Sequence, residues 1–423
     1  MTVSTSSHTI PSPIHTDTPK RAPAAARLVI AMLRKIQHGS LRLHLPGEQV
    51  LLLGDAVAQG HHAELRVQDW RVFAAILRGG DIAFAEAFMD GTVTSPHLPT
   101  LLKLMVLNRD ALATAIYGTW WGSLIDRVLH LFRSNSKRQA RKNIAAHYDL
   151  GNAFYTLWLD NCMSYSAALF DSPYTAQAAD DDARLAAAQA AKYQRVLDEL
   201  ALPLGATVLE IGCGWGGFAE AAARAGHSST GLTLSTEQLS YAKTRADTGG
   251  WGDKAEFKLQ DYRDEAHAGG YAGIASIEMF EAVGEPYWPS YFECIARNLQ
   301  ANGRACVQTI VIDNALFERY RTGTDFIQRY IFPGGMLPSP AVFAAQAERA
   351  GLRVTKQHAF GLDYARTLAV WRARFMRQLD AVRAQGYPER FIRMWEFYLA
   401  YCEAGFVAGD INVVQFTLQK RVG

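Results

Sequence analysis

The sequence contains few cysteines, no long apolar run and almost no net charge. Its five cysteines in 423 residues show no paired spacing, which argues against a disulfide scaffold or a metal cage and is typical of a reducing compartment. No apolar run reaches the roughly 20 residues of a membrane-spanning helix, and the first residues lack a hydrophobic signal core. A net charge of +2 gives no reason to expect a nucleic acid partner. These absences predict a cytoplasmic protein without a bound metal ion.

The chain is too long for one simple core, so two folded units are expected. Residues 1–25 are rich in Ser, Thr, Pro and Ala and predict a disordered tail. Residues 26–110 mix short strand and helix patterns, which predicts a small α+β domain. Residues 111–142 form the predicted linker, in which a helical stretch with Trp120 and Trp121 runs into a basic cluster. This pattern is typical of a membrane-surface helix and equally of an inter-domain helix before a solvated linker, and both interpretations stay open.

A glycine-rich turn at 212–217 is the most informative stretch of the sequence. An apolar run at 206–211 predicts a buried strand, and 218–225 predicts a helix. The spacing of Gly212 and Gly214 fits both dinucleotide-binding proteins and methyltransferases. Dinucleotide binding needs an acid at the end of the next strand, and none stands at 231–235, whereas Glu210 occupies a position where methyltransferases commonly carry an acid. The turn therefore predicts S-adenosylmethionine binding.

Residues 143–423 predict the catalytic domain. Strand patterns at 206–211, 229–234, 255–259, 273–279 and 304–311 alternate with helical segments, which predicts a mainly parallel sheet with helices on both faces. Two later strands are expected at 352–358 and 411–419, the second closing the sheet as an antiparallel edge. Residues 361–400 are predicted to be mostly helical, and their many aromatic residues are interpreted as core.

A series of motifs spans almost the whole of this domain. They are HYDLGN from His147, MSYSAA from Met163, the glycine turn, GLTLSTEQ from Gly231, QDYRD from Gln260, MFEAVG from Met279, YIFPGGMLP from Tyr330, Tyr364 and GDI from Gly409. In this order they closely resemble the cyclopropane fatty acid synthase family. The resemblance implies a Rossmann-like methyltransferase fold with a seven-stranded sheet. Residues 26–110 look like the small lipid-carrier-like domain of bacterial members.

The resemblance also implies a set of cofactor contacts. Tyr165 and Ser166 are expected to bind the methionine end of S-adenosylmethionine, and Gly212 and Gly214 to pass close to it. The ribose region is expected to contact a neutral polar set, and the adenine an acid with a neighbouring ring. These residues are Glu210 before the turn, Thr233, Ser235 and Gln238 for the ribose, and Asp261 and Tyr262 for the adenine.

In the family that the chain resembles, a bound bicarbonate ion removes a proton after the methyl group has been transferred to an alkene. Glu281 and Tyr364 match two of its ligands, and Ile310 matches the backbone ligand. Gln308 replaces the usual histidine, and Ala167 replaces the usual cysteine. Gln308 retains hydrogen-bonding capacity, whereas the Ala167 side chain has none. Aromatic faces stabilise the intermediate carbocation, and the candidates for this role are Tyr148, Phe280, Tyr330 and Tyr364.

Two outcomes remain open for the proton acceptor. A rearranged site still closes a cyclopropane ring, or it directs the carbocation to a methylene- or methyl-branched chain. Glu278 adds a second carboxylate near the strand end. It is a candidate proton acceptor, cofactor contact or neutral structural partner, and the sequence does not rank these roles.

The expected activity is therefore transfer of a methyl or methylene group from S-adenosylmethionine to the double bond of an unsaturated phospholipid acyl chain. Cyclopropane formation is the family-level expectation. The alternatives are branching of the chain, a non-catalytic lipid-binding relative and a small-molecule methyltransferase. The expected partners are acyl chains and the inner face of the membrane, where the protein would be peripheral. Bicarbonate as a bound anion and a homodimer are left open.

Overall fold

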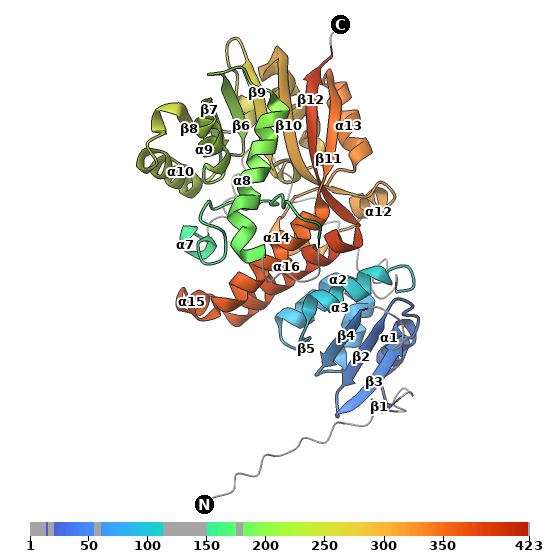
Figure 1. Cartoon of the computed structure of the whole chain (residues 1–423). Helices are drawn as coiled ribbons and strands as arrows, with labels where there is room; N and C mark the ends of the chain where they lie inside the picture. The colour runs from blue at the N-terminus through green and yellow to red at the C-terminus, as the bar shows by residue number, and fades with distance from the viewer. Residues whose placement is uncertain (1–13, 16–20, 55–60, 113–149, 175–180, 422–423) are drawn as a thin grey trace, which may run out of the picture. The chain divides into compact units, whose positions relative to one another are not determined.

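The structure is a computed structural model that describes residues 14–15, 21–54, 61–112, 150–174 and 181–421. The chain divides into two compact units, residues 1–123 and 124–423 (Figure 1). The predicted linker, with Trp120 and Trp121, lies outside the described residues apart from its first two positions. No helix among the residues that the structure describes is long and apolar enough to cross a membrane.

Among its described residues, the N-terminal unit has a five-stranded sheet and three helices, in agreement with the predicted α+β domain. Its strand order is β1-β3-β2-β4-β5, with β2 antiparallel to β3 and parallel to β4. Alternate residues of β2, such as Leu41 and Leu43, are fully buried, as expected for a strand with one face on a core. The elements are β1 (Ile14–His15), α1 (Ala24–Leu33), β2 (Ser40–Leu45), β3 (Gln49–Gly54), β4 (His62–Val67), α2 (Arg71–Met89), β5 (Val93–Thr94) and α3 (Leu98–Leu107).

The structure differs from the expected disordered tail at two points. Ile14–His15 form β1, which pairs in parallel with Val50 and Leu51 of β3. Helix α1 begins at Ala24, two residues before the predicted boundary at 26. A two-residue edge pairing depends on backbone hydrogen bonds, so it leaves no periodic pattern in the sequence.

The catalytic unit contains the predicted seven-stranded sheet. Its order is β11-β12-β10-β9-β6-β7-β8. Strand β6 pairs in parallel with β7 and β9, and β9 pairs in parallel with β10, so the carboxyl ends of these strands lie along one edge. The strands are β6 (Thr207–Ile211), β7 (Ser228–Thr233), β8 (Ala255–Leu259), β9 (Tyr271–Ile277), β10 (Leu299–Ile312), β11 (Leu352–Ala359) and β12 (Ile411–Lys420).

The expectation that residues 411–419 form an edge strand was wrong. Strand β12 is antiparallel, as predicted, but it lies between β10 and β11, and β11 is the edge. Six consecutive residues of β12 are buried, whereas most of β11 is partly or fully exposed. The reason is visible in the composition: 413–418 is largely apolar, and 353–358 carries Arg, Lys, Gln and His, which suit an exposed edge.

Helices cover both faces of the sheet, as predicted (Figure 1). Successive residues of β6 point to opposite faces: Val208 packs in a core cluster with α8 and α9, and Leu209 packs with α11 and α13. The core therefore forms two layers, one on each side of the sheet. The helices are α8 (Asp181–Leu200), α9 (Gly217–Arg224), α10 (Thr236–Thr248), α11 (Trp288–Asn298) and α13 (Pro340–Arg349).

The last helices form an aromatic layer beside the sheet. Helices α14 (Gly361–Arg377) and α16 (Glu389–Ala408) lie side by side and are joined by α15 (Leu379–Ala384) (Figure 1). Trp371 and Trp395 are almost completely buried, which confirms that these aromatic residues belong to the core. The short helix α7 (Asn152–Tyr155) contributes Phe154 to the same cluster, in T-shaped contact with Trp395. Helix α12 (Phe317–Thr322) and the π-helix η6 (Ile327–Ile331) lie between β10 and α13 in the chain.

Candidate active site

The glycine turn joins β6 to α9 as the sequence predicts. Gly212 has a φ of 87° and Gly214 a φ of 51°, values that side-chain-bearing residues rarely adopt. A Cβ on Gly212 would lie 2.8 Å from the Met279 side chain, whereas no described residue other than its chain neighbours lies within 4 Å of the Cβ position of Gly214. The turn thus leaves open space at Gly214, next to the N-terminus of α9, where backbone N–H groups face a ligand.

The predicted ribose contacts form one hydrogen-bonded group between β7 and α10. The Thr233 hydroxyl accepts from the Ser235 N–H at 3.1 Å and donates to the Gln238 side-chain oxygen at 3.0 Å. Ser235 caps α10 by accepting from the Gln238 N–H at 3.3 Å. All three side chains are buried. The structure therefore brings these three predicted residues together and fixes their rotamers.

The two residues predicted to bind adenine lie in a 3-10 turn after β8. The buried Asp261 carboxylate accepts from the Arg263 guanidinium at 2.6 and 2.8 Å and from the Arg263 N–H at 3.0 Å. The Tyr262 ring packs edge-on against Tyr291, with centroids 5.6 Å apart. Burial raises the pKa of the Tyr262 hydroxyl to about 12, so it stays protonated. Arg263, which sequence reasoning missed, holds the carboxylate in place, and the adenine contact stays a prediction.

Tyr165 and Ser166 lie in the loop between α7 and α8, against the aromatic layer. The Tyr165 hydroxyl shares a hydrogen bond of 2.8 Å with Tyr398 of α16. The Tyr165 ring lies 5.4 Å from the Trp371 ring and 5.6 Å from the Trp158 ring, centroid to centroid. A loop residue that is enclosed in this way is held as rigidly as one in a helix.

Ser166 has an unexpected partner in the buried Lys192 of α8. The Lys192 ammonium donates to the Ser166 hydroxyl at 2.5 Å and lies 4.0 Å from the Tyr193 ring centroid. Complete burial lowers the pKa of Lys192 to about 8, against the attraction of Glu278 and Glu210. Burial raises the pKa of Glu210 to about 8, against the attraction of Lys192. The cofactor end of the site therefore contains a buried cation that sequence reasoning did not identify.

The sequence does carry a signal for Lys192. It stands on the buried stripe of α8, at helical spacing from Leu185, Ala188 and Val196. A lysine on an apolar stripe is uncommon unless it is paired, so its position indicates a buried partner.

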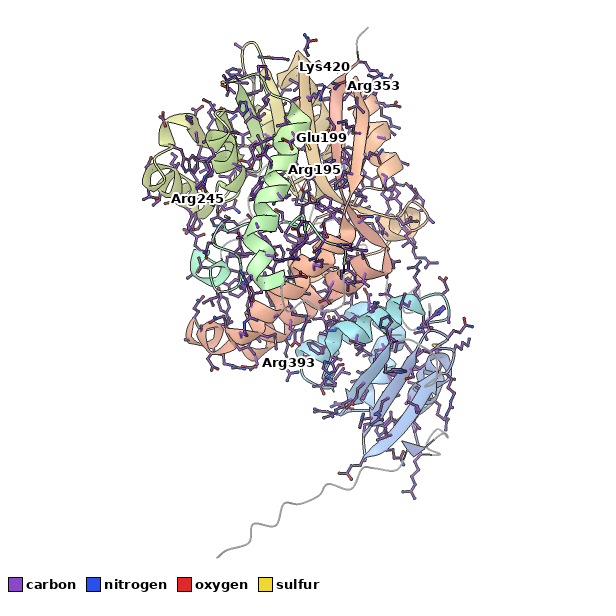
Figure 2. All side chains as sticks on the ribbon, in the orientation of Figure 1. Arg195, Glu199, Arg245, Arg353, Arg393 and Lys420 are labelled. Carbon is purple, nitrogen blue, oxygen red and sulfur yellow. The ribbon has the colours of Figure 1, made fainter. Side chains whose placement is uncertain are left out.

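Arg245 of α10, labelled in Figure 2, hydrogen-bonds both to the loop between α7 and α8 and to the glycine turn. Its guanidinium donates to the Cys162 carbonyl at 2.6 Å and to the Trp215 carbonyl at 3.4 Å. It also pairs with the Glu220 carboxylate of α9 at 2.5 Å. One arginine therefore connects three segments that surround the predicted methionine end of the cofactor.

Glu278 is the most densely hydrogen-bonded carboxylate of the predicted catalytic set. Its Oε1 accepts from the Ala167 N–H at 2.8 Å and from Gln308 Nε2 at 2.7 Å, and its Oε2 accepts from the Tyr364 hydroxyl at 2.6 Å. Its backbone is in the left-handed region, with a φ of 50°, which is uncommon for a residue with a side chain and often marks a functional position. Three segments distant in the chain thus converge on one carboxylate at the end of β9.

Gln308 owes its orientation to a residue that sequence reasoning missed. Gln415 of β12 donates its amide Nε2 to Gln308 Oε1 at 3.0 Å. The amide nitrogen of Gln308 is thereby directed at Glu278. Gln415 stands directly opposite Gln308 in the antiparallel pairing, so it was detectable only once β12 had been placed beside β10.

Glu281 lies in the 3-10 turn that follows Glu278 and has a different environment. Its Oε1 accepts from the Ile310 N–H, and its Oε2 is buried without a hydrogen-bond partner among the described residues. Burial, together with the negative charge of Glu278, raises the pKa of Glu281 to about 8. Burial also raises the pKa of Glu278, but hydrogen bonds from Tyr364, Ala167 and Gln308 oppose that rise. The hydrogen bonds therefore favour the negative charge on Glu278 over Glu281, whose pKa of about 8 favours its protonated form at neutral pH.

The four aromatic residues predicted to stabilise the carbocation lie in different surroundings. Tyr364 of α14 is at the site, and burial beside Glu278 raises its pKa, so its hydroxyl remains a donor. The Phe280 ring is enclosed in the core, stacked on Trp288 at 5.6 Å. Tyr330 lies in η6 against Phe326, with ring centroids 5.6 Å apart. Tyr148 lies outside the described residues.

Comparison with known proteins assigns the family. The model of the mycolic acid cyclopropane synthetase family matches residues 135–416, about two thirds of the chain. The fold is that of an S-adenosylmethionine-dependent methyltransferase. The chain belongs to the mycolic acid cyclopropane synthetase family, which includes the cyclopropane-fatty-acyl-phospholipid synthases.

Individual relatives carry two kinds of name. The tuberculostearic acid methyltransferase UfaA1 of Mycobacterium tuberculosis is 39% identical, over 81% of this chain and 80% of its own. The cyclopropane-fatty-acyl-phospholipid synthase of Escherichia coli is 33% identical, over 87% of this chain and 91% of its own. Among solved structures, the mycolic acid cyclopropane synthase CmaA1 complexed with SAH and CTAB is 30% identical and aligns with a TM-score of 0.60, covering 66% of this chain and 98% of its own. Lipid methyl transfer is common to these names, whereas the product differs.

Proposed function

We propose that the protein transfers the methyl group of S-adenosylmethionine to the double bond of an unsaturated phospholipid acyl chain and releases a methylene-branched chain. The observation that carries the choice of product is the Glu278 carboxylate with its three hydrogen-bond donors. The name of UfaA1, a methyltransferase at 39% identity, supports the same choice.

An alkene has no proton to lose before attack, so the site acts by positioning and by excluding water. The cofactor supplies an electrophilic methyl group on sulfur. The π electrons of the acyl chain form the new C–C bond to this methyl carbon, the C–S bond breaks with its electrons on sulfur, and the neighbouring chain carbon becomes cationic. The half-buried Tyr165 and the buried Trp371 pack together at the loop where the methyl donor is expected.

The fate of the carbocation decides the product. Early loss of a proton from the new methyl group gives a cyclopropane ring, because the C–H electrons then close onto the cationic carbon. If the proton is lost later, a hydride first shifts from the methyl-bearing carbon to its neighbour, and the C–H electrons then form an exocyclic double bond. Hydrogen bonds to a carboxylate stabilise its charge and weaken it as a base. Burial raises the pKa of Glu278 and its three donors oppose that rise, so it is a weaker base than the same buried carboxylate would be without them, which favours the later loss and the methylene-branched chain.

Cyclopropane formation is the second candidate. The Escherichia coli cyclopropane-fatty-acyl-phospholipid synthase, which this chain matches over 91% of its length, supports it. The two candidates share the cofactor, the acyl substrate and the proton that is lost. They differ only in whether the hydride moves.

The substrate class also suggests where the protein acts. Phospholipid acyl chains lie in a bilayer, so we place the enzyme peripherally at the cytoplasmic face of the membrane. We assign membrane-surface contact to the aromatic and basic linker at 111–142 and lipid handling to the N-terminal unit, in line with their sequence patterns. A homodimer is compatible with this placement.

The test is incubation with S-adenosylmethionine and vesicles whose mono-unsaturated chains carry deuterium on both vinylic carbons. A hydride shift leaves both deuterium atoms on one carbon and produces exocyclic methylene protons, read by proton and carbon NMR. Ring closure leaves one deuterium on each ring carbon and produces upfield ring protons, which would contradict the branched product. Vesicles of saturated phospholipid serve as the control. Absence of methylated lipid from both kinds of vesicle would contradict the proposed function as a whole.

A further inference from the structure

Bicarbonate does not fit the site as the chain builds it. Of the positions expected to hold it, the Ala167 N–H, Gln308 Nε2 and the Tyr364 hydroxyl already donate to Glu278. The Ile310 N–H already donates to Glu281. A further anion would find these donors occupied and two carboxyl groups beside it, which disfavours a third negative charge.

We propose that Glu278 is the chain's own proton acceptor, a carboxylate of the protein that stands in place of a bound anion. The inference rests on the proposed function, because it names the group that takes the proton from the transferred methyl group. Its basis is geometric: donors from the α7–α8 loop, from β10 and from α14 converge on both of its oxygens, and its backbone has a φ of 50°, which is uncommon for a residue with a side chain.

The carboxyl groups of Glu278 and Glu281 have different surroundings, which favour different protonation states. Glu278 has three donors, and these donors, together with the attraction of buried Lys192, oppose the rise that burial causes in its pKa and favour its charged form. Glu281 accepts from the Ile310 N–H, and its Oε2 is buried without a hydrogen-bond partner among the described residues, so burial and the charge of Glu278 favour its protonated form. A protonated Glu281 also lowers the repulsion that would otherwise raise the pKa of Glu278 further.

The step balances without another reactant. One C–H bond of the transferred methyl group breaks, and its electrons form the exocyclic double bond or close the ring. The proton goes to a Glu278 oxygen, and the positive charge of the acyl chain and the negative charge of the carboxylate both disappear. No oxidant or reductant takes part, so an exocyclic double bond formed here is not reduced to a methyl branch at this site.

The two other roles of Glu278 predict different behaviour. A structural partner would affect the stability of the fold more than the reaction. A cofactor contact would affect the affinity for the nucleoside. A base affects the turnover number and leaves both the stability and the cofactor affinity nearly unchanged.

The first test is Glu278→Gln, which preserves shape and two polar atoms. Turnover on mono-unsaturated phospholipid vesicles is expected to fall by about 100-fold or more, since general bases contribute about 10²–10⁴-fold. The affinity for S-adenosylhomocysteine, measured by calorimetry, is expected to stay within a factor of about three, which is less than 1 kcal/mol. The matched control is Glu199→Gln near the C-terminal end of α8 (Figure 2), a buried carboxylate that accepts from Thr417 and lies outside the site.

The second test is Glu278→Gly, which suits the positive φ and removes the carboxylate. Turnover is expected to be lost and then restored by about tenfold or more on adding formate or bicarbonate, as small carboxylates that replace a missing base. Full activity of Glu278→Gln would overturn the inference, and so would an inactive Glu278→Gly that neither anion restores. In both cases the proposed function still stands if the wild-type protein methylates the lipid. A wild-type protein that methylates no lipid would instead overturn the proposed function.

Discussion

The cofactor end and the proton-acceptor end of the catalytic unit are built in different ways. The cofactor end uses short motifs at the ends of adjacent strands: Gly212 and Gly214 after β6, and Thr233 and Ser235 after β7. The proton-acceptor end joins single residues from a loop, two strands and a helix around Glu278. Short motifs form the turn and the ribose group of the first end, with Tyr165 and Arg245 adding long-range contacts, whereas every side-chain donor to Glu278 at the second end comes from a distant segment. Substitutions at the two ends should therefore have separable effects on binding and on turnover.

The largest effect in this comparison is expected for Tyr364→Phe. The substitution removes a donor to a charged group, worth about 1.5–3 kcal/mol, so turnover at neutral pH should fall by about 10–100-fold. Because the lost hydrogen bond favoured the ionised form, the pKa of Glu278 should rise. The acid limb of the turnover–pH profile should then move to higher pH by roughly one unit. An unchanged profile, with normal affinity for S-adenosylhomocysteine, would separate Tyr364 from the proton acceptor.

At the cofactor end, Gly214→Ala should weaken binding of S-adenosylhomocysteine by about tenfold or more, equal to about 1.4 kcal/mol. The added Cβ strains a backbone with φ 51° and fills space in which the ligand is expected. Gly386→Ala is the matched control, since Gly386 has a φ of 90° and open space but lies between α15 and α16. The assignment of Gly214 to the cofactor site would be confirmed if both variants lost the same thermal stability and only Gly214→Ala lost affinity for S-adenosylhomocysteine. Equal affinities in the two variants would contradict it.

Lys192→Met should weaken cofactor binding by about tenfold, because the buried ammonium beside Ser166 faces the expected methionine carboxylate. The pKa of Lys192 is lowered to about 8, so the cation is present below pH 8 and is lost above it. Wild-type affinity, measured by calorimetry, should therefore decline as the pH rises through 8, and the variant should show no such decline. If the cofactor affinity of the variant depended on pH as that of the wild type does, Lys192 would not contact the methionine end of the cofactor.

The smallest effect concerns the pH dependence of stability. Glu281 has a folded-state pKa of about 8 against an ordinary 4.5, so the folded chain binds more protons between these values. The contribution of Glu281 to the free energy of unfolding is thus fully present below pH 4.5 and is lost as the pH rises through 8. Glu281→Gln should remove this part of the slope in melting temperature against pH. A slope identical to that of the wild type would mean that Glu281 is ionised in the folded protein.

The sequence predicts the glycine turn and the strands beside it well because their signals are local, whereas the cofactor contacts stay predictions. The turn at Gly212 follows from residue types at short spacing, and Ser235, expected only as a ribose contact, also caps α10. Strand patterns likewise predict the seven strands of the sheet. They do not predict the position of β12, because its largely apolar sequence has first to be recognised as that of a strand with a neighbour on each side.

The proton-acceptor end is only partly predictable, because its contacts join residues far apart in the chain. Glu281, Tyr364, Gln308 and Ile310 were expected from family resemblance, and the structure places them together. The contribution of Ala167 is a backbone N–H, which residue identity does not reveal. Gln415 becomes significant only through its pairing with Gln308.

The most direct test of the account is the dependence of wild-type turnover on bicarbonate. The measurement compares methylation of mono-unsaturated phospholipid vesicles in buffer stripped of carbon dioxide with the same reaction after bicarbonate is added back. A chain that supplies its own proton acceptor through Glu278 should turn over at the same rate in both. A rate that falls by about tenfold or more without bicarbonate, the loss expected when a general base is removed, would show that a bound anion accepts the proton and would contradict the account.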